Sequence, residues 1–269
     1  MIEEMKKVSV VALDSRRQDV VSQMRDAGVI HLEVEPQESE SLSELRENRA
    51  YIERASVLLP RQRPEGVDTK AHAYNFDSAM GTAQYLTQIA ERRRELEDRL
   101  DQLLREEQRL LPWGDFAPED LEELKRAGLE IELYSLPPKQ FKALEAERVF
   151  TIRETSGQTY FAKAYWADEE RLDLTPVALP ERSLSDIRGE IDEKRAELED
   201  IQRKIAERQP ERENLERAIA ELDDRIRFEE VKVGMNTDEQ LAFITGFVPA
   251  EYEEVVRETA KVGGWGLLI

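Results

Sequence analysis

Cysteine is absent from this 269-residue sequence, and histidine occurs only twice. Without cysteine the chain has no disulfide framework, no thiolate metal ligand and no thiol nucleophile. The two histidines, His31 and His72, have no second histidine at metal-ligand spacing, so we expect both to be ordinary surface residues. The sequence therefore predicts no metal site.

Long apolar runs and aromatic residues are also scarce. No stretch reaches the ~18 consecutive apolar residues of a membrane-spanning helix, and the opening "MIEEMKK" lacks the basic-then-apolar pattern of a signal peptide. Aromatic residues are 7% of the sequence and charged residues 36%, which limits the material for one large core. Walker-type, GxGxxG and Gly-x-Ser-x-Gly motifs are missing as well. We predict no catalytic residue and no cofactor-binding residue.

Charged side chains are what the sequence has in abundance. Acidic residues number 59 and basic residues 39, a formal net charge of −20, which disfavours binding to nucleic acid and to anionic lipid. Because the two signs are interleaved, the pattern indicates long solvated helices instead of disorder. Carboxylate pairs such as Asp223–Asp224 are therefore interpreted as a solvated helix face and not as an acid/base dyad.

The two ends of the chain share one pattern. Residues 8–34 and 243–269 each run from an apolar stretch through a breaker and an amphipathic helix to a glycine and a second apolar stretch. At a constant offset of 235 the following pairs align: Val20 with Val255, Val21 with Val256, and Gly28 with Gly263. One βαβ half cannot bury its own sheet face, whereas two halves complete a split βαβ lobe of the ferredoxin type.

Helix boundaries within this repeat follow from local signals. Asp14 or Ser15 is expected to cap the first helix with its side chain. Gly28 and Gly263 stand where a left-handed residue ends a helix. His31 alternates with apolar neighbours along the second strand, so it is expected to face solvent.

Apolar residues between the two ends recur in steps of three and four. This spacing predicts helices over about 41–59, 78–111 and 183–229 with coiled-coil seams. Pro210 should bend the last of these helices, because it removes a backbone hydrogen bond and crowds the preceding turn. We expect an antiparallel coiled coil within one chain, since both ends must return to the same lobe; an intermolecular coiled coil is the alternative.

Residues 112–182 are sufficient for a second small lobe. Helices are predicted at 118–127 and 138–145, a strand at 131–136, and a hairpin from 149–155 and 159–166 around "SGQ". The predicted fold class is thus α+β: a ferredoxin-like proximal lobe (1–38 with 240–269), a coiled-coil rod (39–111 with 183–239) and an α+β distal lobe (112–182). Together they would form a dumbbell.

Aromatic residues in the distal lobe are the candidate partner interface. Trp113 and Phe116 belong to "LPWGDF" (111–116), and Trp166 ends the predicted hairpin. Exposed aromatic residues often anchor protein interfaces. The alternative, which we favour for Trp113 and Phe116, is that both pack inside the lobe where the chain turns sharply.

Three stretches in order resemble one protein family. They are "MKKVSVVALDSRRQDVVSQMRDAGVIHLE" (5–33), "LPWGDF" and "FITGFVPAEYEEVV" (243–256). Residues 5–33 resemble the opening of subunit I (subunit a) of rotary V-type and archaeal-type ATPases. The motif "LPWGDF" is similar to that family's entry into its distal lobe, and Gly246 to Pro249 resemble its Gly-aromatic-Val-Pro return strand.

The resemblance implies a non-catalytic stator fragment of a proton- or sodium-translocating rotary ATPase or ATP synthase. Its expected partners are peripheral-stalk E/G-type heterodimers, bound by the lobes at the cytoplasmic face, and the membrane rotor-ring sector, bound by a membrane half beyond Ile269. The chain is then expected to be a piece of a longer protein or an unusually short homologue. The alternative function is a coiled-coil adaptor, unrelated to ATPases, whose ferredoxin-like lobes bind a ligand or a protein.

Overall fold

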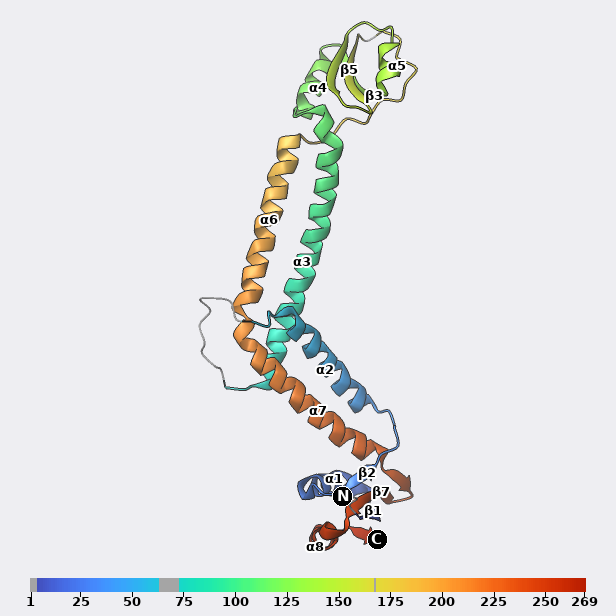
Figure 1. Ribbon diagram of the computed structural model, residues 1–269, viewed down its shortest axis with the longest axis vertical. Coiled ribbons are helices and arrows are strands. Elements are labelled where there is room, and N and C mark those ends of the chain that lie inside the picture. Colours follow the sequence, from blue (N-terminus) through green and yellow to red (C-terminus); the bar gives the residue numbers. More distant parts are fainter. Residues whose placement is uncertain (1–3, 63–72, 167) are drawn as a thin grey trace. The chain divides into compact units, whose positions relative to one another are not determined.

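The computed structural model describes residues 4–62, 73–166 and 168–269. The chain divides into two compact units, the first formed by Met1–Thr87 with Ile205–Ile269 and the second by Gln88–Lys204. Both units mix helix and sheet (Figure 1). His72 lies outside the described residues, so its predicted surface position stays a prediction.

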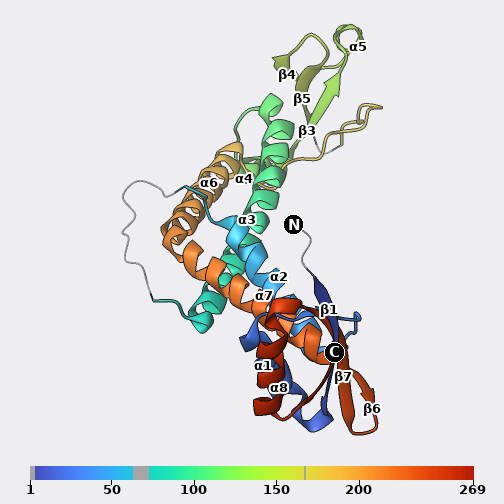
Figure 2. The same ribbon diagram turned by 60° about the horizontal axis from the view of Figure 1, so that its bottom comes forward.

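The first unit is built from both ends of the chain. In chain order its elements are β1 (Met5–Leu13), the 3₁₀ turn η1 (Asp14–Arg16), α1 (Arg17–Ala27), β2 (His31–Glu33), α2 (Glu40–Leu58), the start of α3 (Phe76–Leu110), the end of α6 (Leu184–Glu207), η3 (Gln209–Glu211), α7 (Arg212–Gly234), β6 (Asn236–Asp238), β7 (Leu241–Pro249), η4 (Ala250–Tyr252), α8 (Glu253–Gly263) and β8 (Gly266–Leu268). Figure 2 shows α1 and α8 on the same side of the sheet.

One antiparallel sheet joins the two ends of the chain, with strand order β2-β7-β1-β8 and β6 paired to β7. Strand β1 pairs with β7 along its full length, from Met5 opposite Pro249 to Leu13 opposite Leu241. Every second residue of these strands is buried beneath α1 and α8, among them Val10 and Ile244. The alternation of β-branched residues therefore sets which face of the sheet carries the core.

The sequence repeat is confirmed, but its offset is not constant. Strand β7 and helix α8 follow β1 and α1 by 236 residues, while β8 follows β2 by 235. The structural counterpart of Gly28 is consequently Gly264, since both have φ of +67° and end their helices. The prediction for Gly263 was wrong by one residue: it is the last residue of α8, and a Cβ there would lie 2.5 Å from Nε1 of Trp265.

The predicted side-chain cap at the start of α1 was also wrong. Asp14 and Ser15 lie in η1, and α1 begins at Arg17 without a capping hydrogen bond from a side chain. The Asp14 carboxylate instead accepts a hydrogen bond from Nε of Arg17 at 3.0 Å. His31 is exposed on β2, as predicted.

Helices α2 and α7 of the first unit pack antiparallel. The hydrogen bonds between the two helices show this direction. Arg46 donates to Glu230 at 2.9 Å, and the later Arg49 donates to the earlier Asp223 at 2.5 Å. The predicted helix at 41–59 agrees with α2 within one residue. The predicted helix at 183–229 is interrupted where Pro210 was expected to bend it, because η3 separates α6 from α7.

The second unit contains the remainder of α3 and most of α6, together with η2 (Leu111–Trp113), α4 (Pro118–Arg126), β3 (Leu129–Leu136), α5 (Pro138–Lys142), β4 (Val149–Glu154) and β5 (Thr159–Trp166). Within this unit α3 and α6 lie side by side and antiparallel (Figure 1). Arg99 bonds to Glu190 and Arg188 to Glu107, at 2.8 and 2.7 Å.

The three-stranded sheet of the second unit has the order β3-β5-β4. One of its faces joins the cluster at the end of α3 and the start of α6, which includes Leu103, Ile187 and Trp113. The other face carries a separate cluster around Tyr134, Phe161 and Tyr165. Helix α5 ends at Lys142, earlier than the predicted 145. Within the described ranges, no helix is long and apolar enough to cross a membrane.

Candidate functional site: a groove beside helix α4

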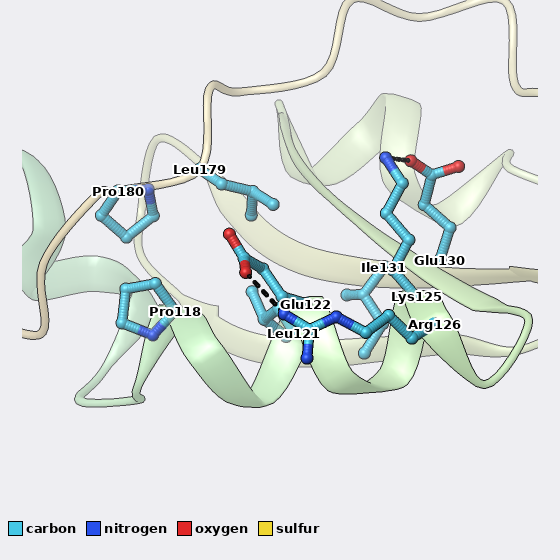
Figure 3. A pocket seen from close by; sticks show the side chains of 9 residues that line it. All are labelled: Pro118, Leu121, Glu122, Lys125, Arg126, Glu130, Ile131, Leu179 and Pro180. Carbon is cyan, nitrogen blue, oxygen red and sulfur yellow. Dashed lines mark hydrogen bonds and ion pairs between the residues drawn. The ribbon is translucent and has the colours of Figure 1, made fainter.

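A groove of about 580 Å³ opens beside α4 in the second unit. Its apolar lining comes from three segments: α4, β3 and the chain just before α6 (Figure 3). The apolar lining residues are Pro118, Leu121, Ile131, Leu179 and Pro180. This volume is within the range of protein binding pockets. Because the groove is open along one side, it can accept a row of side chains from another segment.

Helix α4 forms where the sequence predicts it. Pro118 occupies the first helical turn, where its missing N–H costs nothing, and Gly128 follows the helix with φ of +91°. Acidic residues fill its first turn and basic residues its last, which complements the helix dipole. None of the residues of α4 is fully buried, and Leu121 is half-buried where the helix lines the groove.

Ion pairs border the apolar lining of this groove. Glu122 pairs with Arg126 at 3.3 Å along α4, and Lys125 pairs with Glu130 at 2.6 Å (Figure 3). Glu130 also accepts a hydrogen bond from Arg171. Lys125 first and Arg171 second lower the pKa of Glu130, so this carboxylate is charged at neutral pH. The groove thus presents an apolar floor between charges of both signs.

The three aromatic residues predicted as an interface do not form one surface. Trp113 is 6% exposed and packs edge-on against Tyr160, with ring centroids 5.1 Å apart. Phe116 is half-buried in the same cluster. Trp166, at the end of β5, is 54% exposed and lies outside that cluster. Of the three residues, only Trp166 is more than half exposed.

Sequence reasoning missed the groove and, separately, a buried ion pair in the same unit. The helix at 118–127 was predicted from its breakers, but no local signal places Leu179 and Pro180 opposite Leu121. Lys163, in the middle of a predicted strand, is 3% exposed. Its ammonium group donates to Glu169 at 2.6 Å and to the carbonyl oxygen of Ala164 at 3.1 Å.

The pair of Lys163 and Glu169 fastens the chain after β5 to the sheet. Glu169 also accepts hydrogen bonds from Arg148 and from the backbone N–H of Trp166. The pKa of Glu169 is lowered to about 2, mainly by the hydrogen bond from Lys163. Desolvation acts in the opposite direction, and the hydrogen bond from Arg148 lowers the pKa further. The arrangement is structural, and within the described ranges no group of three or more His, Cys, Asp or Glu residues could hold a metal ion.

Glu169 should make the stability of the second unit depend on acid pH. A folded-state pKa below the ordinary value means that its contribution is complete above about pH 4.5 and is lost as the pH falls toward 2. Glu169→Gln should therefore reduce the melting temperature at pH 7 more than at pH 3. Glu170→Gln, at an exposed neighbouring position, is the matched control. An equal reduction at both pH values for Glu169→Gln would contradict the assignment; thermal melts followed by circular dichroism measure it.

No family model matches this chain. Among curated proteins, it is 26% identical over 269 residues to V-type ATP synthase subunit I of Borreliella burgdorferi, covering 98% of this chain and 43% of that protein. It is 23% identical over 286 residues to V-type ATP synthase subunit I 1 of Treponema pallidum, covering 98% and 46%. The resemblance to subunit I of V-type ATP synthases is confirmed.

The similarity to subunit I is not confined to one unit, because the alignments include nearly every residue of this chain. The chain spans less than half the length of these two subunit I relatives. Among solved structures, it is similar to the cytoplasmic N-terminal domain of subunit I, homolog of subunit a, of V-ATPase. That match has 14% identity and a TM-score of 0.41, and it covers 97% of this chain and 99% of the other.

Proposed function

We propose that this chain is a non-catalytic stator portion of subunit I in a rotary V/A-type ATPase or ATP synthase, at the cytoplasmic face of the membrane. The similarity to two subunit I proteins along 98% of the chain carries this proposal. In the proposed complex the chain connects peripheral stalks to the membrane sector. Contact with the ion-translocating rotor ring is assigned to parts of subunit I outside this chain.

A lobe–rod–lobe division suits such a connector. The proposed parts are the proximal lobe of residues 1–38 and 240–269, the rod of 39–111 and 183–239, and the distal lobe of 112–182, arranged as a dumbbell. The strand order β2-β7-β1-β8, with α1 and α8 as its crossovers, supports a ferredoxin-like proximal lobe. Two attachment points on one connector bind by avidity even when each contact is modest.

The groove beside α4 is the proposed contact of the distal lobe with a helical E/G-type heterodimer. An apolar floor between charged walls fits the apolar stripe of an amphipathic helix. Its lining residues Leu121, Ile131 and Leu179 supply that floor, and the flanking ion pairs fix the orientation of the helix. Trp166 is kept as a further candidate contact because of its exposure.

Isothermal titration of the full chain with the purified peripheral-stalk heterodimer tests the proposed function. Leu179→Glu should weaken binding by about tenfold or more, because the new carboxylate would be buried against apolar side chains without a partner. Val57→Glu, at an exposed position of α2, should leave the affinity unchanged. Leu179 is itself exposed, so the variant retains its fold.

Two results would count against this function. If the wild-type chain does not bind the heterodimer, the adaptor alternative is favoured over the stator. If the wild type binds but Leu179→Glu binds equally well, the stalk contacts another surface and the groove assignment is wrong.

A further inference from the structure

Helix α8 carries apolar side chains on a face that the sheet does not cover. Val255 and Val262 are 48% and 86% exposed, and the half-buried Thr259 lies between them. Tyr252, exposed at the start of the helix, precedes Val255 by three positions. These four residues, called here the α8 stripe, follow steps of three, four and three, which is the a/d spacing of a coiled-coil seam.

The stripe is separate from the face of α8 that supports the fold. Val256, Ala260 and Gly263 are the buried residues of α8, and they pack toward the core beneath the sheet and α1. Val255, Thr259 and Val262 each directly precede one of these buried residues, so the stripe borders the buried face of the helix. Nothing among the described residues covers Val262, the most exposed of the large apolar residues in the described ranges.

Two glutamates border the open side of the stripe. Glu251 and Glu258 each precede a stripe residue by one position, which places them where a coiled coil carries its g residues. Both are exposed, and neither has an ion-pair or hydrogen-bond partner within the described ranges. Glu253, by contrast, is paired with Lys6 at 2.5 Å and with Arg257 at 2.7 Å. The charge at these two flanking positions is thus acidic and unpaired, while Lys261, exposed and one position before Val262, is farther around the helix from the stripe.

We infer that the α8 stripe docks a basic amphipathic helix of a protein partner, with apolar residues against the stripe and Lys or Arg against Glu251 and Glu258. Opposite charges at the flanks of a seam select partners in this way, and like charges reject them. A second copy of this chain is disfavoured, since two α8 stripes facing each other would bring four unpaired carboxylates together. This surface belongs to the first unit and does not depend on the function proposed for the groove.

Fluorescence anisotropy with two labelled synthetic peptides tests this inference on the full chain. Both peptides have about three heptads with Leu and Ile at a and d; one carries Lys and the other Glu at e and g. The Lys peptide should bind, and the Glu peptide should bind about tenfold more weakly or not at all. Val255→Ser with Val262→Ser should weaken the Lys peptide about tenfold, whereas Val57→Ser, at an exposed valine of α2, should not.

Charge reversal separates the stripe from general attraction to a chain of net charge −20. Glu251→Lys with Glu258→Lys should transfer the preference from the Lys peptide to the Glu peptide. The inference is overturned if neither peptide binds the wild type, or if the serine variant binds the Lys peptide as well as the wild type does. It is also overturned if sedimentation shows a dimer that the serine variant abolishes, because a second copy would then occupy the stripe.

Discussion

Replacing Phe161 with alanine is expected to destabilise the second unit by about 4 kcal/mol, as for other fully buried aromatic residues. Phe161 is 0% exposed on the central strand β5. Its ring stacks on Tyr134 at a centroid distance of 5.5 Å and packs against Phe141 at 4.9 Å. Truncation would remove the contacts that hold α5 on the sheet and leave a cavity that the strands cannot close.

Urea denaturation followed by far-UV circular dichroism, with hydrogen exchange to assign the effect to the second unit, measures this loss. Phe150→Ala is the matched control, because Phe150 lies on the edge strand β4 of the same sheet and is 60% exposed. Its replacement should change the free energy of unfolding by no more than about 0.5 kcal/mol. Similar losses for both variants would show that the cluster around Phe161 does not stabilise the unit.

Gly246→Ala is expected to destabilise the first unit by about 3 kcal/mol, the upper part of the usual range for overpacking. A Cβ at Gly246 would lie 2.5 Å from the backbone oxygen of His31 and 3.1 Å from Cα of Leu32. These atoms belong to strand β2, which pairs with β7 at this point. Backbone atoms cannot rotate out of the way as a side chain can, so β2 would have to separate from β7.

A second glycine in the first unit provides a control with the opposite sign. Gly81 lies inside α3, and a Cβ there would meet nothing within 4 Å. Gly81→Ala should therefore stabilise the unit by roughly 0.5–1 kcal/mol through the better helix propensity of alanine. Denaturant titration with hydrogen exchange at β2 compares the two variants. If Gly246→Ala keeps wild-type protection at Leu32, the close approach of the strands is not what requires glycine.

The helices could be predicted from the sequence to within a few residues. Apolar residues in steps of three and four, and breakers such as Pro112 after α3 and Gly28 after α1, are local signals that do not depend on the rest of the fold. The predicted helix at 41–59 corresponds to α2, and that at 78–111 corresponds to α3 from Phe76 to Leu110. The repeated pattern at the two ends of the chain likewise predicted that they share one sheet, because a single βαβ half would leave one face of its sheet uncovered.

Features that depend on distances between segments could not be predicted in this way. The offset changes by one residue before β8, so Gly264 and not Gly263 has the positive φ that ends α8, while Gly263 is required by the close packing of Trp265. The groove depends on Leu179, which is 58 positions after Leu121 in the chain and opposite it in the fold. Likewise, the sequence pattern of β5 does not predict that the Lys163 side chain is buried and paired with Glu169.

By itself, the sequence determined the mixture of charged helical seams with short strands, the pairing of the two chain ends in one sheet, and the resemblance to subunit I. Periodicity and breakers act over one or two turns, so they can be read without coordinates. The tertiary structure alone decided which apolar residues remain exposed, among them Leu179 at the α4 groove and Val255 and Val262 of the α8 stripe. Exposure depends on what the rest of the chain covers, and a residue's own identity does not contain that information.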